Sequence, residues 1–120
     1  MGRRARRRQR ESGPEPTACT TAYPDGEGNV LTLRDDLSSG TIERFRGLES
    51  RAGASIEDLW QRRLEFLFER LAARWEIAGL PLEGQAELLG RYRMADTDLR
   101  RWVHETIVAH ARERLPELGV

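Results

Sequence analysis

Apolar residues recur at helical spacing through the middle of the chain. Successive members lie three or four positions apart, so a helix would place them on one face; they are Ile56, Trp60, Leu64, Leu67, Leu71, Trp75 and Ala78. Asp58 lies three residues after Ser55, a spacing typical of a capping box at a helix start. The pattern predicts a long central helix over about residues 56–78, with apolar surface for several neighbours.

The segment "AGLPLEG" interrupts this pattern. Gly79 can adopt the left-handed conformation that ends a helix, and Pro81 disfavours a simple continuation. We therefore expect a helix corner at this point, with Leu80 and Leu82 presented at the bend. A short polar helix over about residues 83–90 is predicted to follow.

A closing helix is predicted after Asp96, a residue type that favours the N-cap position. Its expected inner face consists of Leu99, Trp102, Val103, Thr106, Ile107 and His110. The corner at Gly79 would let this helix fold back onto Trp75. Pro116 marks its exit.

The region before the central helix has weaker patterns. Turn residues in "PDGEGN" separate two β-compatible runs, residues 20–23 and 30–33, which predicts a short strand or hairpin. Two strands alone are marginal in water. They must therefore lie on the helices or gain strands from another copy of the protein. Ser38, Ser39 or Thr41 is expected to cap a short helix that ends near residue 49.

These patterns predict a mainly α fold. Residues 20–120 would form a single small domain of about four helices with the short N-terminal β-strand or hairpin. Residues 1–19 are polar, first rich in Arg and then containing Pro, and are predicted to be a disordered basic tail.

Charge divides the chain in the same way. The net charge is zero, but residues 1–10 carry six Arg and no acid. Residues 11–120 hold fourteen Arg against twenty acids, a net of minus six. An acidic body repels phosphate, which argues against a nucleic-acid interface across the whole domain. The Arg-rich tail keeps a nucleic-acid contact open as a less favoured partner.

Candidate chemistry is sparse. His104 and His110 are six positions apart, so a helix would point them in different directions, unlike the two His of a zinc-binding H-E-x-x-H motif. Cys19 has no His near it in sequence, and the acidic pairs precede predicted helices, where capping explains them. No Gly-rich phosphate loop is present. We expect no enzyme activity, metal or cofactor. No run approaches the length of a membrane span and no secretory signal is evident, so a cytoplasmic protein is expected.

One alternative is a DNA-binding or regulatory protein with a helix-turn-helix-like element at residues 85–108. Arg100, Arg101 and His104 would then face the major groove. The expected connection from Gly90 to Asp96 is longer than the three or four residues of that motif. A dimer with a purely structural role is a further alternative.

Partner binding is the favoured interpretation. Three Trp are many for a small domain, and aromatic residues dominate both cores and interfaces. A helix corner carrying Leu-Pro-Leu suits contact with another chain. The predicted partner-binding residues are Trp75, Leu80, Pro81, Leu82 and Trp102.

The segments "GNVLTLRDDLSSGTIERFR" and "RWEIAGLPLEGQAELLGRYRMADTDLRRWVHETI" resemble the small tail assembly chaperones of actinobacterial tailed phages and prophages. The first resembles that family's short β segment and acidic helix opening, and the second its Trp-containing helix, Leu-Pro-Leu corner and closing helix. The resemblance implies a bacterial host cytoplasm, self-association into a homo-oligomer, and binding that shields the tape measure protein during tail assembly. It transfers no catalytic residue.

Overall fold

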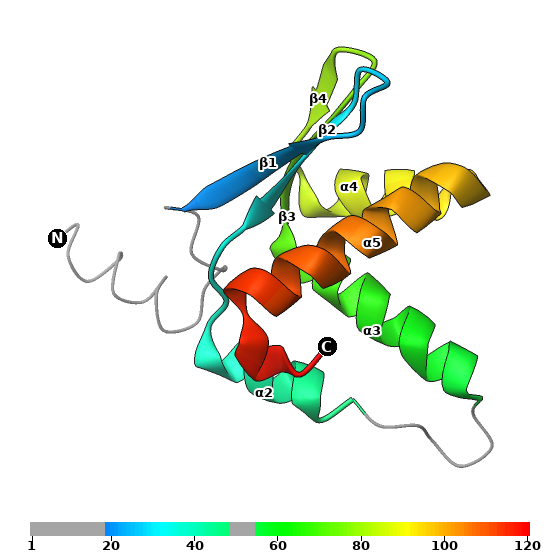
Figure 1. Ribbon diagram of the computed structural model, residues 1–120. Coiled ribbons are helices and arrows are strands. Elements are labelled where there is room, and N and C mark those ends of the chain that lie inside the picture. The colour runs from blue at the N-terminus through cyan, green and yellow to red at the C-terminus, as the bar shows by residue number, and fades with distance from the viewer. Residues whose placement is uncertain (1–18, 49–54) are drawn as a thin grey trace, which may run out of the picture.

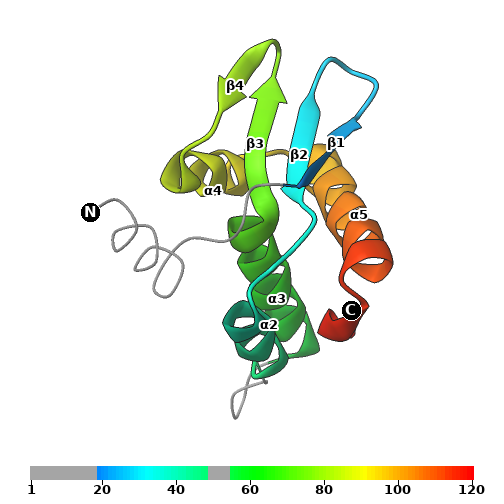
Figure 2. The same ribbon diagram turned by 90° about the vertical axis from the view of Figure 1, so that its left-hand side faces the viewer.

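The computed structural model describes residues 19–48 and 55–120. A four-stranded antiparallel sheet stands at one end of the described part, with helices packed on one side of it (Figures 1 and 2). The elements are β1 (Thr20–Pro24), β2 (Val30–Arg34), α2 (Ser39–Arg46), α3 (Ile56–Leu71), β3 (Ala72–Ile77), β4 (Leu80–Leu82), α4 (Gln85–Arg93), α5 (Thr97–Arg114) and a 3-10 turn η1 (Pro116–Leu118). Residues 1–18 of the predicted basic tail lie outside the described residues.

The prediction of a mainly helical domain with a short β element is wrong. The described residues form four α-helices together with a sheet in the order β1-β2-β3-β4. The expected N-terminal hairpin is present, since β1 and β2 pair antiparallel around the "DGEGN" turn. The second hairpin, β3 and β4, occupies the stretch that helical spacing assigned to the end of the central helix and its corner.

Helix α3 ends at Leu71, about seven residues before the predicted end, and passes directly into β3. Side chains from elsewhere satisfy carbonyls that the shortened helix leaves open. Arg34 Nη1 donates to the carbonyl oxygens of Arg70 and Ala72, at 3.2 and 2.8 Å. Gln85 Nε2 donates to the Glu69 carbonyl at 3.2 Å. The switch from helix to strand is therefore stabilised by the last residue of β2 and the first of α4.

Pairing with β2 explains why β3 is extended. The register aligns Tyr23, Leu31, Trp75 and Leu82 in one row across the four strands. Leu31 and Trp75 are both fully buried in this row. Burying side chains as large as these outweighs the modest helix preference of the local sequence, because propensities amount to fractions of a kcal/mol per residue.

Gly79 does take a positive φ, but in a hairpin turn. Ala78 and Gly79 connect β3 and β4 with φ values of 51° and 81°. A two-residue turn with positive φ at both positions is the type I′ hairpin turn, whose twist matches antiparallel strands. The predicted helix corner at this point is therefore wrong.

The helix starts agree with the sequence. Ser55 and Asp58 form a reciprocal capping box, and Asp96 caps α5 by accepting from Leu99 N at 2.8 Å. Below the sheet, buried residues of all layers form one core: Leu31, Leu33, Leu37, Phe45, Leu67, Phe68, Leu71, Ala72, Trp75, Leu88, Tyr92, Val103, Ile107, Ala111, Leu115 and Leu118. Fully buried His110 ties α5 to this sheet through Tyr23 Oη at 2.7 Å and the Arg34 carbonyl at 2.8 Å.

Candidate protein-binding site

Trp75, a predicted partner-binding residue, lies in the core. Its side chain is 0% exposed, with the Phe68 ring 5.7 Å away edge-on and the Arg91 guanidinium 6.0 Å from its ring centroid. The indole therefore has neighbours in a strand and in a helix, and a cation lies over its ring. Trp75 therefore has no surface that a second protein can reach without opening the fold.

Leu80 lies on the surface, where the sequence placed it. Its side chain is 71% exposed at the start of β4, beside the turn, and Pro81 is exposed next to it. Leu82 is half-buried because the register sets it opposite Trp75. The predicted Leu-Pro-Leu element is thus a strand whose two leucines share one face of the sheet, with Leu82 half-buried against the core, Leu80 exposed at the tip and Pro81 on the opposite face.

The tips of the two hairpins are joined. The Ala78 backbone N–H donates to Asn29 Oδ1 at 3.1 Å, and Asn29 Nδ2 donates to Asp25 Oδ2 at 2.7 Å. Although burial acts to raise the pKa of Asp25, hydrogen bonds from Glu27 and Asn29 lower it on balance. A carboxylate that stays ionised holds the two turns together, so Leu80 is presented on a braced support.

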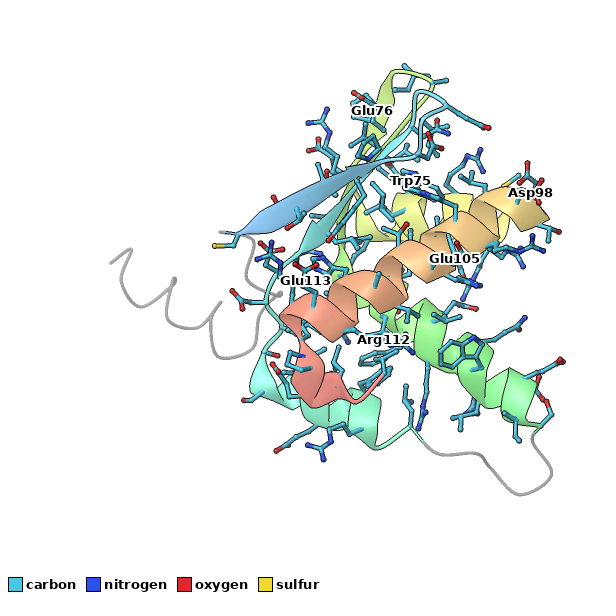
Figure 3. The ribbon with its side chains drawn as sticks, viewed as in Figure 1. Trp75, Glu76, Asp98, Glu105, Arg112 and Glu113 are labelled. Carbon is cyan, nitrogen blue, oxygen red and sulfur yellow. The ribbon has the colours of Figure 1, made fainter. Side chains whose placement is uncertain are left out.

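A hollow of about 430 Å³ lies beside these tips and the start of α5. We call it the acid-lined hollow. Its lining combines apolar side chains, four carboxylates and one cation: Asp25, Glu27, Asn29, Ile77, Arg91, Asp96, Asp98, Leu99 and Trp102. Asp98 stands in the first turn of α5 (Figure 3). Trp102 is half-buried here, so of the two tryptophans predicted to bind a partner, this one is open to the surface.

Both edge strands carry a proline whose backbone faces outward. Asp35 N donates to Cys19 O and Asp25 N to Asn29 O, so odd-numbered residues of β1 face β2 and Pro24 faces away. In a two-residue hairpin the flanking pair, here Ile77 and Leu80, is the hydrogen-bonded one, so Pro81 also faces away. Proline offers no N–H to an added strand. Binding through side chains is thereby favoured over strand addition.

A second exposed apolar region was not anticipated as a surface. Ile56 and Trp60, counted in the helical stripe, are 86% and 43% exposed. Trp60 lines a groove of about 390 Å³ between α3 and α5, which we call the α3–α5 groove; its lining is Trp60, His104, Glu105, Val108, Ala109 and Arg112. The spacing of the stripe gave no sign of this, because it does not show where neighbouring elements stop.

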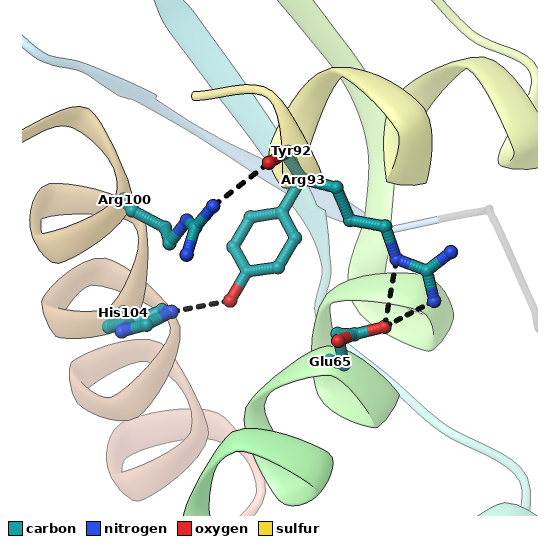
Figure 4. Close-up of polar contacts among 5 residues, drawn as sticks. All are labelled: Glu65, Tyr92, Arg93, Arg100 and His104. Atoms are coloured by element: carbon teal, nitrogen blue, oxygen red, sulfur yellow. Dashed lines mark hydrogen bonds and ion pairs between the residues drawn. The ribbon is translucent and has the colours of Figure 1, made fainter. Parts of the chain in front are cut away.

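Two of the three residues of the DNA-reading alternative, Arg100 and His104, lie in a polar cluster between α3, α4 and α5 (Figure 4). Helices α4 and α5 are joined by only residues 94–96, a shorter connection than the sequence suggested and within the range of a helix-turn-helix. However, Arg100 Nη2 donates to the Arg93 carbonyl at 2.8 Å, and His104 Nε2 is 2.5 Å from Tyr92 Oη. Arg101 alone of the three predicted reading residues is exposed.

The electrostatics of this cluster favour neutral partners. Burial and then Arg100 lower the pKa of His104, while burial raises the pKa of Tyr92. A neutral imidazole hydrogen-bonded to an un-ionised tyrosine is a cross-link between α4 and α5. The adjoining hollow is only about 90 Å³, too small for a substrate of ordinary size.

The exposed part of the cluster is an ion pair. Arg93 Nη2 lies 2.6 Å from Glu65 Oε1, and this contact raises the pKa of Arg93.

Cys19 is exposed at the start of β1. Within residues 19–48 and 55–120, no group of three or more His, Cys, Asp or Glu is arranged to hold a metal. None of the helices in those ranges is long and apolar enough to cross a membrane.

The geometry described above therefore contains two surfaces suited to macromolecular contact, the Leu80 tip with the acid-lined hollow and the α3–α5 groove. No family model matches this sequence, and no curated protein or solved structure matches it either.

Proposed function

We propose that this chain is a non-enzymatic, protein-binding chaperone for phage tail assembly, which shields the tape measure protein in the cytoplasm of a bacterial host. The observation that carries the proposal is a 71% exposed leucine, Leu80, on a braced two-residue hairpin beside the acid-lined hollow. An exposed large apolar side chain on a fixed support is typical of a contact residue.

The chemistry of the acid-lined hollow suits an amphipathic helix. Leu99, Trp102 and Ile77 offer apolar contact, and Asp25, Glu27, Asp96 and Asp98 can pair with basic residues along the helix flanks. Segments of a long tape measure protein that await burial in the tail tube would expose such helices. The acidic body also keeps a complex soluble by charge repulsion.

The test is co-expression with the tape measure protein encoded in the same genome. The wild-type chain is expected to raise the soluble fraction of that protein and to co-purify with it. Leu80→Asp is expected to reduce co-purification by at least about tenfold, since a charge replaces an apolar contact, while the free energy of unfolding changes by less than about 0.5 kcal/mol because the side chain is at the surface.

Ile56→Asp is the matched control. It also replaces a large, exposed apolar side chain, but at the far end of α3. Equal loss of binding in both variants, or none in either, would contradict a contact at Leu80. Absence of any complex with the wild-type chain would contradict the chaperone function itself.

The short α4–α5 connection keeps DNA binding as the second candidate. Duplex DNA binding that weakens steeply between low and moderate salt would support it, because phosphate contacts release counterions. Arg101→Glu should then reduce the affinity, since Arg101 is the exposed member of the predicted reading set.

A further inference from the structure

The outer face of α5 has a self-complementary charge pattern. Glu105, Val108, Ala109 and Arg112 all line the α3–α5 groove, which places them on one side of the helix. Along the helix, an acidic residue comes first, two small apolar residues follow, and a basic residue comes last. The midpoint of this pattern falls between residues 108 and 109. An antiparallel copy of this helix would therefore set Glu105 against the other copy's Arg112, and the reverse, with Val108 and Ala109 between them.

The charged groups of this face have no ion partner among residues 19–48 and 55–120. Neither Glu105 nor Arg112 forms an ion pair with any described residue; Arg112 Nε donates to the Val120 carbonyl at 3.1 Å, which leaves the rest of its guanidinium for another contact. Trp60 flanks the same groove and is 43% exposed. A charge-complementary, partly apolar surface is therefore left uncovered by the described residues.

We infer that a second copy of this chain covers the α3–α5 groove through a two-fold, antiparallel α5–α5 contact. A two-fold axis repeats every contact between two different residues, so one acid and one base per copy form two ion pairs. The flanking Trp60 side chains add apolar area to both sides of the contact. The outward-facing Pro24 and Pro81 disfavour the competing route, in which copies join through their sheet edges.

This inference does not depend on the proposed function, because it uses neither Leu80 nor the acid-lined hollow. A contact built from one helix face per copy is at the small end of stable interfaces. We expect a reversible dimer with a dissociation constant of roughly micromolar order.

The experiment is sedimentation equilibrium of the full chain over a concentration series, with charge-reversal variants. The wild type is expected to shift from monomer to dimer as concentration rises. Glu105→Arg and Arg112→Glu should each weaken self-association by at least about tenfold, because each converts two opposite-charge contacts into two like-charge contacts.

Mixing these two variants is the decisive measurement. One then carries Arg at both positions and the other Glu at both, so the mixed pair regains two complementary contacts and should form a heterodimer. The double variant Glu105→Arg/Arg112→Glu should likewise recover self-association. Circular dichroism of each variant checks that the fold is retained.

Glu113→Arg provides the matched control. Glu113 is adjacent to Arg112 but about 100° around the helix, and Figure 3 shows the two side chains on different sides of α5. Arg112 lines the groove toward α3, whereas burial and then the Glu113 charge raise the pKa of Tyr23 in the sheet. This variant should dimerise like the wild type. A monomeric wild type, single variants that associate normally, or a mixture that stays monomeric would each overturn the α5–α5 contact.

Discussion

Trp60 and Trp75 belong to the same apolar stripe, yet they differ in how far they are buried. Trp75 is 0% exposed, enclosed by a neighbouring strand, by Phe68 and by Arg91. Trp60 is 43% exposed and lines an open groove. The two side chains have the same chemistry, and only the elements packed around them differ. A position on an apolar stripe therefore indicates a surface that must be covered, and the cover can come from the same chain or from another.

The sealed and open regions meet at the middle of α3. From Leu64 to Trp75 the stripe is buried against α2, α4, α5 and the sheet, whereas Ile56 and Trp60 are exposed. Figure 1 shows α3 running away from the sheet, with its first residues on the side opposite α2. The sheet end of the molecule is thus the stable core, and the opposite end of α3 retains apolar surface.

Truncation of the two tryptophans should give the largest contrast. Trp75→Ala is expected to lower the free energy of unfolding by about 3–5 kcal/mol, because it opens a cavity in a fully packed site. Trp60→Ala should change it by no more than about 1 kcal/mol in the monomer, since solvent already reaches that side chain. Urea unfolding at low protein concentration measures both. Similar losses in the two variants would contradict the division into sealed and open regions.

The hairpin itself can be tested at Ala78, where the helix and strand interpretations predict opposite signs. Ala78→Asn should raise the free energy of unfolding by up to about 1 kcal/mol, because Asn followed by Gly is the preferred type I′ sequence and Asn tolerates positive φ. In a helix the same change would cost about 0.7 kcal/mol.

Gly79→Ala is the companion variant. Its Cβ would meet open space, so any loss reports only the backbone conformation at φ +81°. We expect a loss of about 1–2 kcal/mol. The midpoint temperatures of thermal unfolding of the two variants should shift in opposite directions. A lower midpoint for Ala78→Asn would contradict the turn.

Local signals were sufficient where the structure depends on local contacts. Ser55 with Asp58, and Asp96, announce helix starts by side-chain to backbone bonds within one turn. The "DGEGN" turn likewise identifies the first hairpin. In the second hairpin the local signal is ambiguous, because residues four apart, such as Leu71 and Trp75, share a face in both a helix and a strand. Alternation over Arg74, Trp75, Glu76 and Ile77 was present in the sequence but competed with the longer helical stripe.

In the candidate site, too, some features could be predicted from local sequence and others could not. The exposure of Leu80 could be predicted from a Leu-Pro-Leu segment at a bend, whichever element forms the bend. The acid-lined hollow could not, because Asp25, Ile77 and Asp98 reach it from three elements distant in sequence. The burial of Trp75 depends on its register with Leu31, which no single segment reveals.

The smallest expected effect concerns His104, which connects the two regions. It lines the open groove with Trp60, and its Nε2 is hydrogen-bonded to Tyr92 Oη; the Tyr92 ring stacks on Phe68 at 4.7 Å. Burial and Arg100 lower the pKa of His104 below its ordinary value of 6.5. As the pH falls below about neutrality, the unfolded chain takes up this proton first, so the free energy of unfolding should decrease until the folded-state pKa is reached. Above the unfolded pKa this contribution is constant.

His104→Gln retains a side chain that can donate to or accept from Tyr92 but does not titrate, so it should flatten the decline in stability over that pH window. Urea unfolding of both proteins at a series of pH values measures the difference in slope. The carboxyl of Asp25, whose pKa is lowered from 3.8, loses its contribution only at more acidic pH, so the two effects separate. An unchanged slope in His104→Gln would mean that the imidazole is equally protonated in the folded and unfolded chains, and that the wall between the sealed core and the open groove is more hydrated than its packing indicates.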